Sequence, residues 1–475
     1  MSSREKHPSI KHTLDYRNLF TGLDIPTPLL DGSLKTYINL DNAASTPAFK
    51  AVQEAVNDFL NYYSSVHRGT GFKSQLATHF YEEARAITLR FLGADPAEHT
   101  CIFVKNTTEA VNKLARRFPF SEQRNIVLTS GMEHHSNDLP WRAAAQTIHI
   151  ALTSDGRLDE AAFSATLAQF GKQVALVAIS GASNVTGFIN PIHRLAEQAH
   201  QAGAMIFVDC AQLAPHRKIE LKSLADADHL DFVALSAHKM YAPFGSGALV
   251  GRRDIFSQGE PDQRGGGTIE IVTLDEVVWA DPPERDEAGS PNTVGAIALA
   301  AAICQLEAVG MENVAAHEAE LTAYALQKLP SVPGIRIFGD IDPDRSMSRL
   351  GVIPMLLQHT PHFLVSAILG YEYGIGVRSG CFCAHPYLLH LLGITKDEAQ
   401  AVRNRMIAGD KSEMPGMIRA SFGLYNTEAE IDQLVAALKD IARGAYHGRY
   451  RQDRATGEYT PENWQIDFNS YFSFT

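Results

Sequence analysis

Residues 231–243 read DFVALSAHKMYAP, and this stretch decides how the rest of the chain is interpreted. An apolar run typical of a buried strand ends at Ser236, and Lys239 follows it among small and aromatic neighbours. Surface lysines usually stand among other charged residues, whereas this one lies where a strand leaves the core. In open α/β sheets, ligands bind outside the carboxyl ends of the strands. The stretch therefore predicts a buried strand with a functional lysine at its end.

The same rhythm of apolar runs and helical segments extends back to about residue 100. The runs CIFVKN, NIVLTS, VALVAIS and AMIFVDCAQ are rich in Val, Ile and Phe. Near-continuous apolar strands suit a parallel sheet covered on both faces, and alternation of strands with helices indicates a doubly wound α/β domain. We therefore expect an α/β fold whose large domain is built on a mainly parallel, doubly wound sheet.

The length of 475 residues is too great for one ordinary core. After about residue 300, long helical stretches precede a few strands, which indicates a smaller α+β domain. We expect an N-terminal arm over 1–36, a large domain over 37–295 whose early part can join the small domain, a small domain over 296–445 that contains a polar insertion at 388–416, and a tail over 446–475.

Composition excludes several classes of protein. The net charge of −12 argues against a dedicated nucleic-acid binder, which needs a basic face. No stretch approaches the roughly 20 apolar residues that span a bilayer, and the polar start lacks the apolar region of a signal peptide. The five cysteines are too few and scattered for a disulfide framework. We expect a cytoplasmic protein with neither a nucleic-acid nor a membrane partner.

Polar side chains follow five successive predicted strands. They include hydroxyls at a helix N-terminus, where a phosphate binds well, a histidine pair, a carboxylate and a lysine. These residues are Thr107, Thr108, His134, His135, Asn184, Asp209, Gln212, Ser236, His238 and Lys239. The histidine pair lacks the spacing of a zinc site, and we expect no metal.

This set favours one cofactor. Neither the glycine motif of a dinucleotide site nor that of a nucleoside triphosphate site is present. A lysine amine that forms a Schiff base, an acid against a ring nitrogen, a flat histidine and a phosphate site suit pyridoxal 5′-phosphate (PLP). We therefore expect PLP as the cofactor.

A series of motifs supports this expectation. In order they are LDNAAST (40–46), VHRGTG (66–71), TTEAVN (107–112), MEHHSNDLPW (132–141), SNVTG (183–187), VDCAQ (208–212), SAHKMYAPFGSGALVG (236–251), GGGTIE (265–270), EAGSPN (287–292), VRSGCFCAHP (377–386) and RASFGLYNTEAEID (419–432). Together they resemble the class V aminotransferase-fold enzymes with PLP-dependent fold type I, specifically the cysteine desulfurase and selenocysteine lyase group with a short catalytic loop. The resemblance covers roughly residues 37 to 440.

The resemblance implies roles for the residues around the cofactor ring. Lys239 matches the Schiff-base lysine that also shuttles the α-proton of the substrate. Asp209 matches the partner of the pyridine nitrogen, and Gln212 matches the partner of the ring hydroxyl. His134 matches the histidine that stacks on the ring, whereas His135 is expected to be a packing residue.

The resemblance also implies phosphate ligands and a second subunit. Thr108, Ser236 and His238 match phosphate ligands, and Thr107 either joins them or only caps its helix. Thr268 matches a phosphate contact delivered from the partner subunit, which implies a homodimer with active sites at the interface.

The substrate side of the site is implied in the same way. Arg419 matches the arginine that pairs with the substrate carboxylate, Asn184 supports that group, and Arg378 assists the carboxylate or lowers a thiol pKa. Cys383 stands five residues after Arg378, the spacing of the nucleophile in the family, and a free buried thiol is the alternative. Cys381, two residues before Cys383, departs from the family and is closer to the molybdenum-cofactor sulfurases.

The function implied is that of a transferase or lyase that converts L-cysteine, or selenocysteine, to L-alanine. Cys383 takes the sulfur as a persulfide and passes it to an acceptor protein or small thiol. Two alternatives stay open: another class V aminotransferase, lyase or epimerase in which Cys383 is structural, and a catalytically idle scaffold. The sequence names neither the acceptor nor the pathway.

Overall fold

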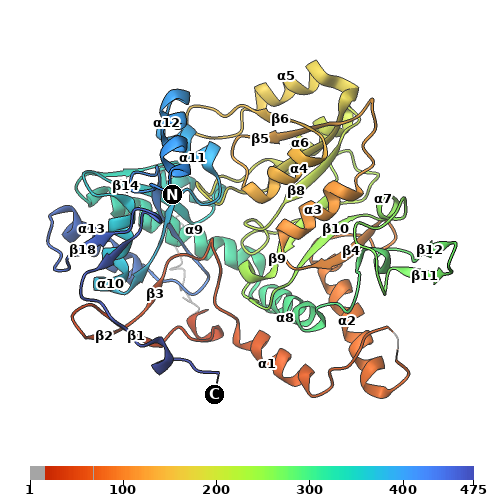
Figure 1. The fold of residues 1–475 in the computed structure, drawn as a ribbon, viewed down its shortest axis with the longest axis horizontal. Helices are drawn as coiled ribbons and strands as arrows, with labels where there is room; N and C mark the ends of the chain where they lie inside the picture. Colours follow the sequence, from red (N-terminus) through yellow and green to blue (C-terminus); the bar gives the residue numbers. More distant parts are fainter. Residues whose placement is uncertain (1–15, 68, 475) are drawn as a thin grey trace, which may run out of the picture.

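The computed structural model describes residues 16–67 and 69–474 (Figure 1). Residues 1–15 of the expected N-terminal arm lie outside the described residues. Buried side chains form a large core around a seven-stranded sheet and a separate core around a four-stranded sheet. The two sheets lie side by side along the molecule, so the described chain has a large and a small domain.

The large sheet is mainly parallel, as the sequence predicts. Strands β5 to β9 run parallel to one another, and β10 is antiparallel to both β4 and β9. In sheet order the strands are β4 (His99–Val104), β10 (Gly247–Arg252), β9 (Phe232–Ser236), β8 (Met205–Asp209), β7 (Val174–Ser180), β5 (Ile126–Ser130) and β6 (Gln146–Ile150).

Helices cover both faces of this sheet, which explains why its central strands β7, β8 and β9 are largely apolar. Along β9, Val233 and Leu235 face one core cluster, whereas Phe232 and Ala234 face the other. The first face carries α1 (Lys50–Leu60), α2 (Phe72–Phe91), α5 (Glu160–Phe170), α6 (Ile192–Gln201) and α8 (Thr293–Val309). The second face carries α3 (Thr107–Arg117), α4 (Leu139–Ala144) and α7 (Arg253–Phe256).

The small domain is an antiparallel sheet packed against helices. Its strands, in sheet order, are β13 (Ile335–Ile337), β14 (Val352–Leu357), β17 (Met417–Ser421) and β16 (Arg378–Gly380). Its core also contains side chains of α9 (Met311–Lys328), α10 (His362–Tyr373) and α13 (Glu428–Ala442). The early strand β3 (Ile38–Asn39) pairs with β15 (Ile375–Gly376), so this early segment packs with the small domain.

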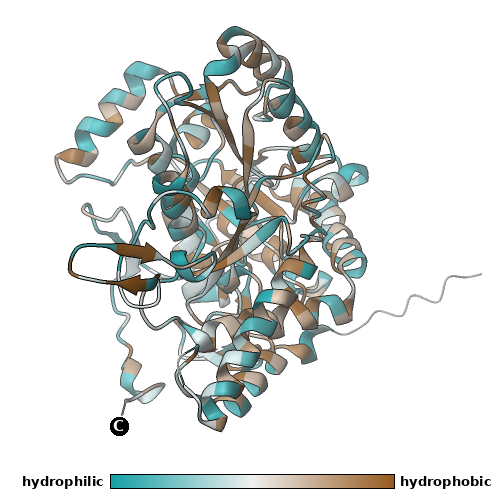
Figure 2. Ribbon diagram, turned by 90° about the vertical axis from the view of Figure 1, so that its right-hand side faces the viewer, coloured by the Kyte–Doolittle hydropathy of each residue, from teal (hydrophilic) through white to brown (hydrophobic). Residues whose placement is uncertain are grey.

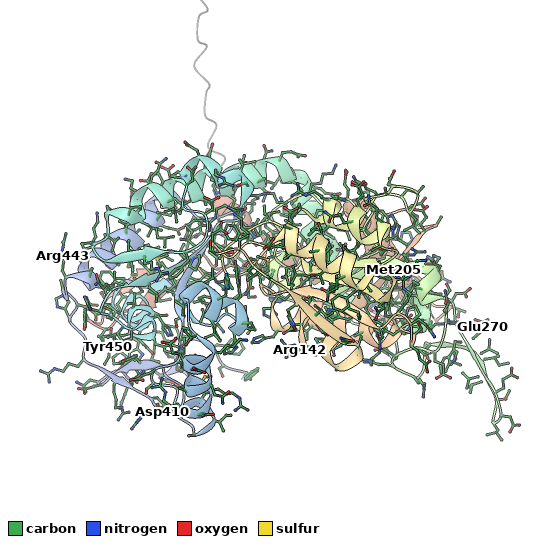
Figure 3. All side chains as sticks on the ribbon, turned by 90° about the horizontal axis from the view of Figure 1, so that it is seen from above. Arg142, Met205, Glu270, Asp410, Arg443 and Tyr450 are labelled. Atoms are coloured by element: carbon green, nitrogen blue, oxygen red, sulfur yellow. The ribbon has the colours of Figure 1, made fainter. Side chains whose placement is uncertain are left out.

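Two short hairpins, one near the N-terminus and one in the C-terminal tail, lie outside the two main sheets. Residues 16–36 contain the hairpin β1 (Pro26–Pro28) and β2 (Leu34–Thr36), and the tail contains the hairpin β18 (Tyr450–Gln452) and β19 (Tyr459–Pro461). The tail is tied down by Glu372, which accepts hydrogen bonds from the N–H groups of His447 and Gly448 and from the Tyr450 hydroxyl. Figure 3 shows Arg443, Tyr450 and Asp410 at the end of the molecule opposite Glu270.

The segment 388–416 divides into a packed part and an exposed part. In α11 (His385–Leu392), Tyr387, Leu388 and Leu391 are buried. In α12 (Lys396–Ile407) no residue is buried. The exposed part of the segment is therefore the part that contains α12.

A hairpin of β11 (Ile269–Val272) and β12 (Val277–Trp279) projects from the large domain. Figure 2 shows it as an apolar arm that stands away from the body of the molecule. Its exposed apolar side chains are Ile271, Val272, Leu274, Val277 and Val278.

Among the described residues, no single helix has both the length and the apolar composition needed to cross a bilayer. The consecutive helices α8 and α9 meet these criteria only as a pair that bends by 76°.

Candidate active site

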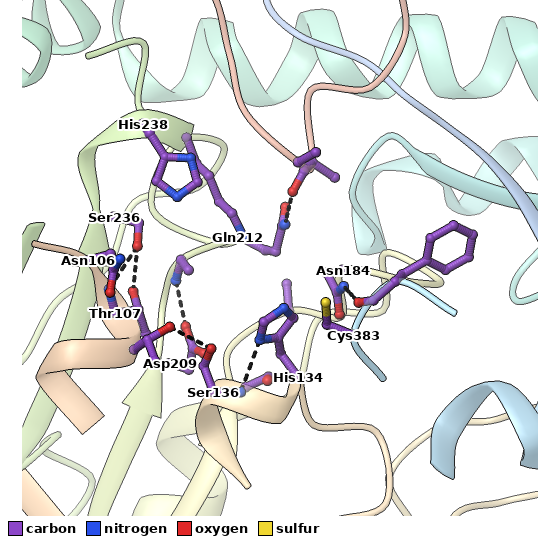
Figure 4. Close-up of a pocket in the computed structure, with 18 of the residues that line it drawn as sticks. Asn106, Thr107, His134, Ser136, Asn184, Asp209, Gln212, Ser236, His238 and Cys383 are labelled. Atoms are coloured by element: carbon purple, nitrogen blue, oxygen red, sulfur yellow. Dashed lines mark hydrogen bonds between the residues drawn. The ribbon is translucent and has the colours of Figure 1, made fainter. Parts of the chain in front are cut away.

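A pocket lies between the two domains, at the carboxyl ends of the large-sheet strands (Figure 4). The large domain contributes Thr107, Thr108, His134, Asn184, Asp209, Gln212, Ser236, His238 and Lys239 to its wall, and the small domain contributes Arg378, Cys383 and Arg419. The structure thus brings together every predicted site residue except Thr268.

Lys239 ends the short 3-10 turn Ala237–Lys239 that follows β9 directly. Among the described residues its ammonium group has no hydrogen-bond or ion-pair partner. Burial lowers the pKa of Lys239 to about 8, against the opposing influence of the Asp209 carboxylate. An amine with a lowered pKa is available in its neutral, nucleophilic form near neutral pH.

Asp209 ends β8, and its carboxylate is buried within the pocket wall. The N–H of Ala211 donates to Oδ1, and among the described residues Oδ2 accepts no hydrogen bond. Burial raises the pKa of Asp209. Since burying a carboxylate is costly unless it is paired, this site suits a cationic N–H group from a ligand.

Gln212 lies one turn after Asp209 and is held by the main chain of the LDNAAST segment. Its Nε2 donates to the carbonyl of Ala43 at 2.7 Å. The amide oxygen is therefore left for a hydroxyl group in the pocket.

His134 precedes a 3-10 turn at the start of the MEHHSN segment, and its ring lines the pocket. The N–H of Ser136 donates to Nδ1 at 3.1 Å, so the proton of the neutral ring is on Nε2. Burial lowers the pKa of His134 to about 3, assisted by the charge of Lys239. A neutral, flat ring held at this position can stack on a planar ligand.

The N-terminus of α3 forms a polar cradle at one end of the pocket. The Asn106 side chain caps the helix by accepting from the N–H of Glu109, and the Ser236 hydroxyl contacts both the N–H and the hydroxyl of Thr107 at 2.9 Å. The Thr108 hydroxyl contacts that of Ser136 at 2.7 Å. Free N–H groups and hydroxyls at a helix N-terminus favour a phosphate.

His238 completes this cradle from the lysine-bearing turn. Its ring lines the pocket, and Nδ1 lies 3.3 Å from the hydroxyl of Ser45. Burial lowers the pKa of His238 to about 4, so the ring is neutral at physiological pH and has a nitrogen free to donate to a phosphate oxygen.

Cys383 approaches from the small domain on a tight turn over residues 381–384. The N–H of Ala384 donates to the carbonyl of Cys381, and Phe382 and Cys383 both have φ of 55°. Positive φ at both central residues defines a type I′ turn, which is strained for residues other than glycine, asparagine and aspartate. Figure 4 shows the Cys383 sulfur directed into the same space as the His134 ring.

The large domain holds this turn from the other side of the pocket. The N–H of His135 donates to the carbonyl of Cys383, and Asn184 Nδ2 donates to the carbonyl of Phe382. His135, expected to be a packing residue, therefore also fixes the position of Cys383.

Two arginines lie directly opposite each other on β16 and β17. Arg378 pairs with Arg419 in the strand register, and both line the pocket. Arg419 donates to Asp41 at 2.7 Å and to the carbonyl of Asn184 at 2.9 Å, whereas its buried Nε has no partner. Like charges opposite each other in a sheet are destabilising, so the pair suits an additional anion such as a carboxylate.

Thr268 does not join this pocket. It is buried at the base of the β11–β12 hairpin, and its hydroxyl donates to the carbonyl of Gly265 at 2.8 Å. Its expected role in a partner's site stays a prediction.

The structure adds residues that the sequence analysis missed. Asn106 had a local signal, since an asparagine three residues before a glutamate is typical of a helix start. Ser136 lies within the MEHHSNDLPW motif, but no feature of the sequence indicates that its hydroxyl contacts that of Thr108. The ion pair of Asp41 with Arg419 joins residues far apart in the chain, and no local pattern indicates it.

These residues fit PLP by their chemistry. A buried, unpaired amine, a buried carboxylate with a free oxygen, a neutral stacking histidine and a helix N-terminus with hydroxyls match the aldehyde, the ring nitrogen, the ring face and the phosphate.

Comparisons with known proteins agree with this fit. The family model for aminotransferase class-V matches residues 38–434. The cysteine desulfurase of Dickeya dadantii is 38% identical over 414 residues, which cover 85% of this chain and 92% of that protein. The cysteine desulfurase of Haloferax volcanii is 36% identical over 89% of this chain and 93% of its own length. Among solved structures, an apo cysteine desulfurase from Thermococcus onnurineus NA1 has a TM-score of 0.74 at 33% identity, over 86% of this chain and 95% of that one.

Proposed function

Because this chain belongs to the aminotransferase class-V family, we propose that it is a PLP-dependent cysteine desulfurase in which Cys383 takes the sulfur of L-cysteine and L-alanine is released. The observation that carries the proposal is the meeting of Lys239 and Cys383 in one pocket, although they come from different domains. A buried lysine alone suits many reactions on amino acids. A thiol held opposite it by a strained turn favours attack on a sulfur atom.

The cofactor would be held by the large-domain residues described above. Asp209 would face the ring nitrogen, His134 the ring, Gln212 the ring hydroxyl, and Thr108, Ser236 and His238 the phosphate. When bound, PLP withdraws electrons from the α-carbon of an amino acid.

Two side chains of this protein would move protons and sulfur. The Lys239 amine, once free of the cofactor, removes the α-proton of the substrate and later returns a proton. The Cys383 thiolate attacks Sγ of the substrate, and the Cβ–Sγ bond breaks with its electron pair left on the carbon skeleton. Cβ then takes up a proton to become the methyl group of alanine, and the sulfur remains on Cys383 as a persulfide. The thiolate is the reactive form, and Arg378, Arg419 and Lys239 supply positive charge around it.

The two arginines would orient the substrate by its carboxylate. A planar guanidinium binds a carboxylate through two parallel hydrogen bonds. Arg378 has no ion pair among the described residues and is free for this task. Arg419 is held rigid by Asp41 and by the carbonyl of Asn184, with its Nε left unpaired.

The assembly we propose is a homodimer in the cytoplasm, with a sulfur-acceptor protein or small thiol as the further partner. The exposed apolar side chains of the β11–β12 hairpin support an association with a second copy, because such patches are rarely left in water. Thr268 is buried at the base of this hairpin, and its contact with the partner's phosphate stays a prediction. Selenocysteine remains an alternative substrate.

The test is the replacement of Cys383 with alanine. The holoenzyme is incubated with L-cysteine and a reductant, and alanine and sulfide are both quantified. We expect Cys383→Ala to reduce alanine formation at least about 100-fold while PLP binding is kept. Cys304→Ala, which removes an exposed thiol elsewhere, is the matched control.

The same experiment separates the alternatives. Unchanged alanine formation by Cys383→Ala would make Cys383 structural and favour another class V reaction. A protein that takes up no PLP would be the idle scaffold.

A further inference from the structure

Cys381 has an environment of its own, distinct from that of Cys383. Its side chain is half-buried, whereas Cys383 is exposed to the pocket. Cys381 Sγ lies 3.0 Å from Nε2 of His385, the first residue of α11. Among the described residues, the Cys383 thiol has no hydrogen-bond partner. The two thiols of one turn therefore differ: one faces the substrate, and the other has a basic neighbour.

The hydrogen bonds around His385 fix the position of its ring proton. The main-chain N–H of His385 donates to Nε2 of His135, so this nitrogen of His135 is an acceptor. His385 Nδ1 lies 3.2 Å from the same atom and must therefore carry the proton of that contact. In the neutral ring of His385, Nε2 then has a free electron pair, and it is directed at the Cys381 thiol.

The surroundings of the Cys381 thiol and the His385 ring keep both groups uncharged until they react. Burial lowers the pKa of His385. Burial also raises the pKa of Cys381, and the charge of Cys383 raises it further. The rings of His135 and His385 are stacked with centroids 5.0 Å apart and planes at 4°. A thiol with an oriented imidazole is the arrangement of an activated nucleophile, and packing alone does not require it.

The turn keeps the two sulfur atoms in one short segment. Cys381 and Cys383 are the first and third residues of the type I′ turn, whose ends lie within about 7 Å of each other. The turn is held by the N–H of His135 and by Asn184, as described above. The separation of the two cysteine residues is therefore set by the geometry of a hydrogen-bonded turn.

We propose that Cys381 is a second sulfur carrier, which takes the outer sulfur of the Cys383 persulfide with His385 as its general base. The proposal rests on the function proposed for Cys383. His385 Nε2 takes the proton of the Cys381 thiol, and the resulting thiolate attacks the outer sulfur of Cys383. A new S–S bond forms on Cys381 while the S–S bond to Cys383 breaks, and Cys383 leaves as a thiolate that recovers the proton. The exchange needs no oxidant or reductant.

The consequence is a free Cys383 before the sulfur leaves the protein. Cys383 can then accept sulfur from the next substrate while Cys381 presents the first sulfur to the acceptor. His385 also borders an apolar groove between α11 and α12.

The test follows the position of the sulfur. The holoenzyme is mixed anaerobically with one equivalent of L-cysteine that carries a sulfur isotope, stopped with an alkylating reagent at successive times, and digested. Fragment mass spectra locate the labelled persulfide. In the wild type we expect the label first on Cys383 and then on Cys381. In Cys381→Ser the label stays on Cys383, and in His385→Gln its transfer to Cys381 slows at least about tenfold.

The remaining outcomes separate this inference from the proposed function. Label on Cys383 that never reaches Cys381, or a Cys381–Cys383 disulfide with release of sulfide, overturns the relay alone. No label on Cys383 in Cys381→Ser overturns the proposed function. Label on Cys381 in Cys383→Ser overturns the order of the two steps. Cys304→Ser is the control and should leave the distribution unchanged.

Discussion

The two halves of the pocket are built in different ways. In the large-domain half, Asp209 is the last residue of β8, Lys239 follows the fully buried strand β9 of the same sheet, and α3 begins beside them. In the small-domain half, Cys383 stands on a strained turn after the three-residue strand β16, and two hydrogen bonds across the pocket keep it in place. The first half is fixed by its own core, and the second depends on the first for its geometry.

This difference separates binding of the cofactor from delivery of sulfur. Changes in the large-domain half should remove the cofactor chemistry altogether. Changes in the small-domain half should leave the cofactor in place and alter what happens to the substrate.

The largest effect is expected at Lys239. Replacing it with alanine removes both the amine that binds the aldehyde and the base for the α-proton. We expect Lys239→Ala to reduce alanine formation at least about 1,000-fold, since a positioned base alone contributes about 10² to 10⁴. The variant should also lose the visible absorbance of lysine-bound PLP.

Lys218 offers the matched control for this change. It is an exposed lysine that pairs with Glu220 and does not line the pocket. Lys218→Ala should keep both the absorbance and the turnover. Activity of Lys239→Ala within tenfold of the wild type would refute the role of Lys239.

The two halves of the pocket also differ in how well the sequence predicts them. The strand ends of a parallel sheet meet at one edge, so a polar residue after each apolar run was enough to gather Asp209, His134 and Lys239. The small-domain half came from motif resemblance alone. No local pattern indicated that Asp41 would bind Arg419, or that Phe382 and Cys383 would both adopt left-handed φ, because these features arise from packing between distant segments.

A smaller effect is expected at Arg378, on the substrate side. Removing a guanidinium that binds a carboxylate costs about 1.5 to 3 kcal/mol. We expect Arg378→Ala to raise the KM for L-cysteine about 10- to 100-fold, with the absorbance of bound PLP unchanged. Initial rates over a range of substrate concentrations separate KM from kcat.

The control for Arg378 lies at the far end of the small domain. Arg443 is exposed and stands after α13 (Figure 3). Arg443→Ala should behave as the wild type. A loss of PLP absorbance in Arg378→Ala would show that the two halves are not separable in the way we describe.

The smallest effect concerns the pH at which the apo-protein takes up PLP. Burial lowers the pKa of Lys239 to about 8, so the amine loses its proton at a lower pH than an exposed lysine. At pH 7 about one amine in ten is neutral, and this neutral fraction falls about tenfold for each pH unit below 7. We expect the rate of uptake, followed by absorbance, to rise with pH and to level off above about pH 8.

Asp209 provides the means to sharpen this last prediction. Its carboxylate opposes the lowering of the Lys239 pKa, so Asp209→Asn should move the midpoint of the uptake rate to a lower pH. The same change should reduce alanine formation, because an amide cannot hold a proton on the ring nitrogen. A midpoint that stays near the pKa of an exposed lysine, or that moves upward in Asp209→Asn, would mean that the large-domain half does not set the reactivity of its own lysine.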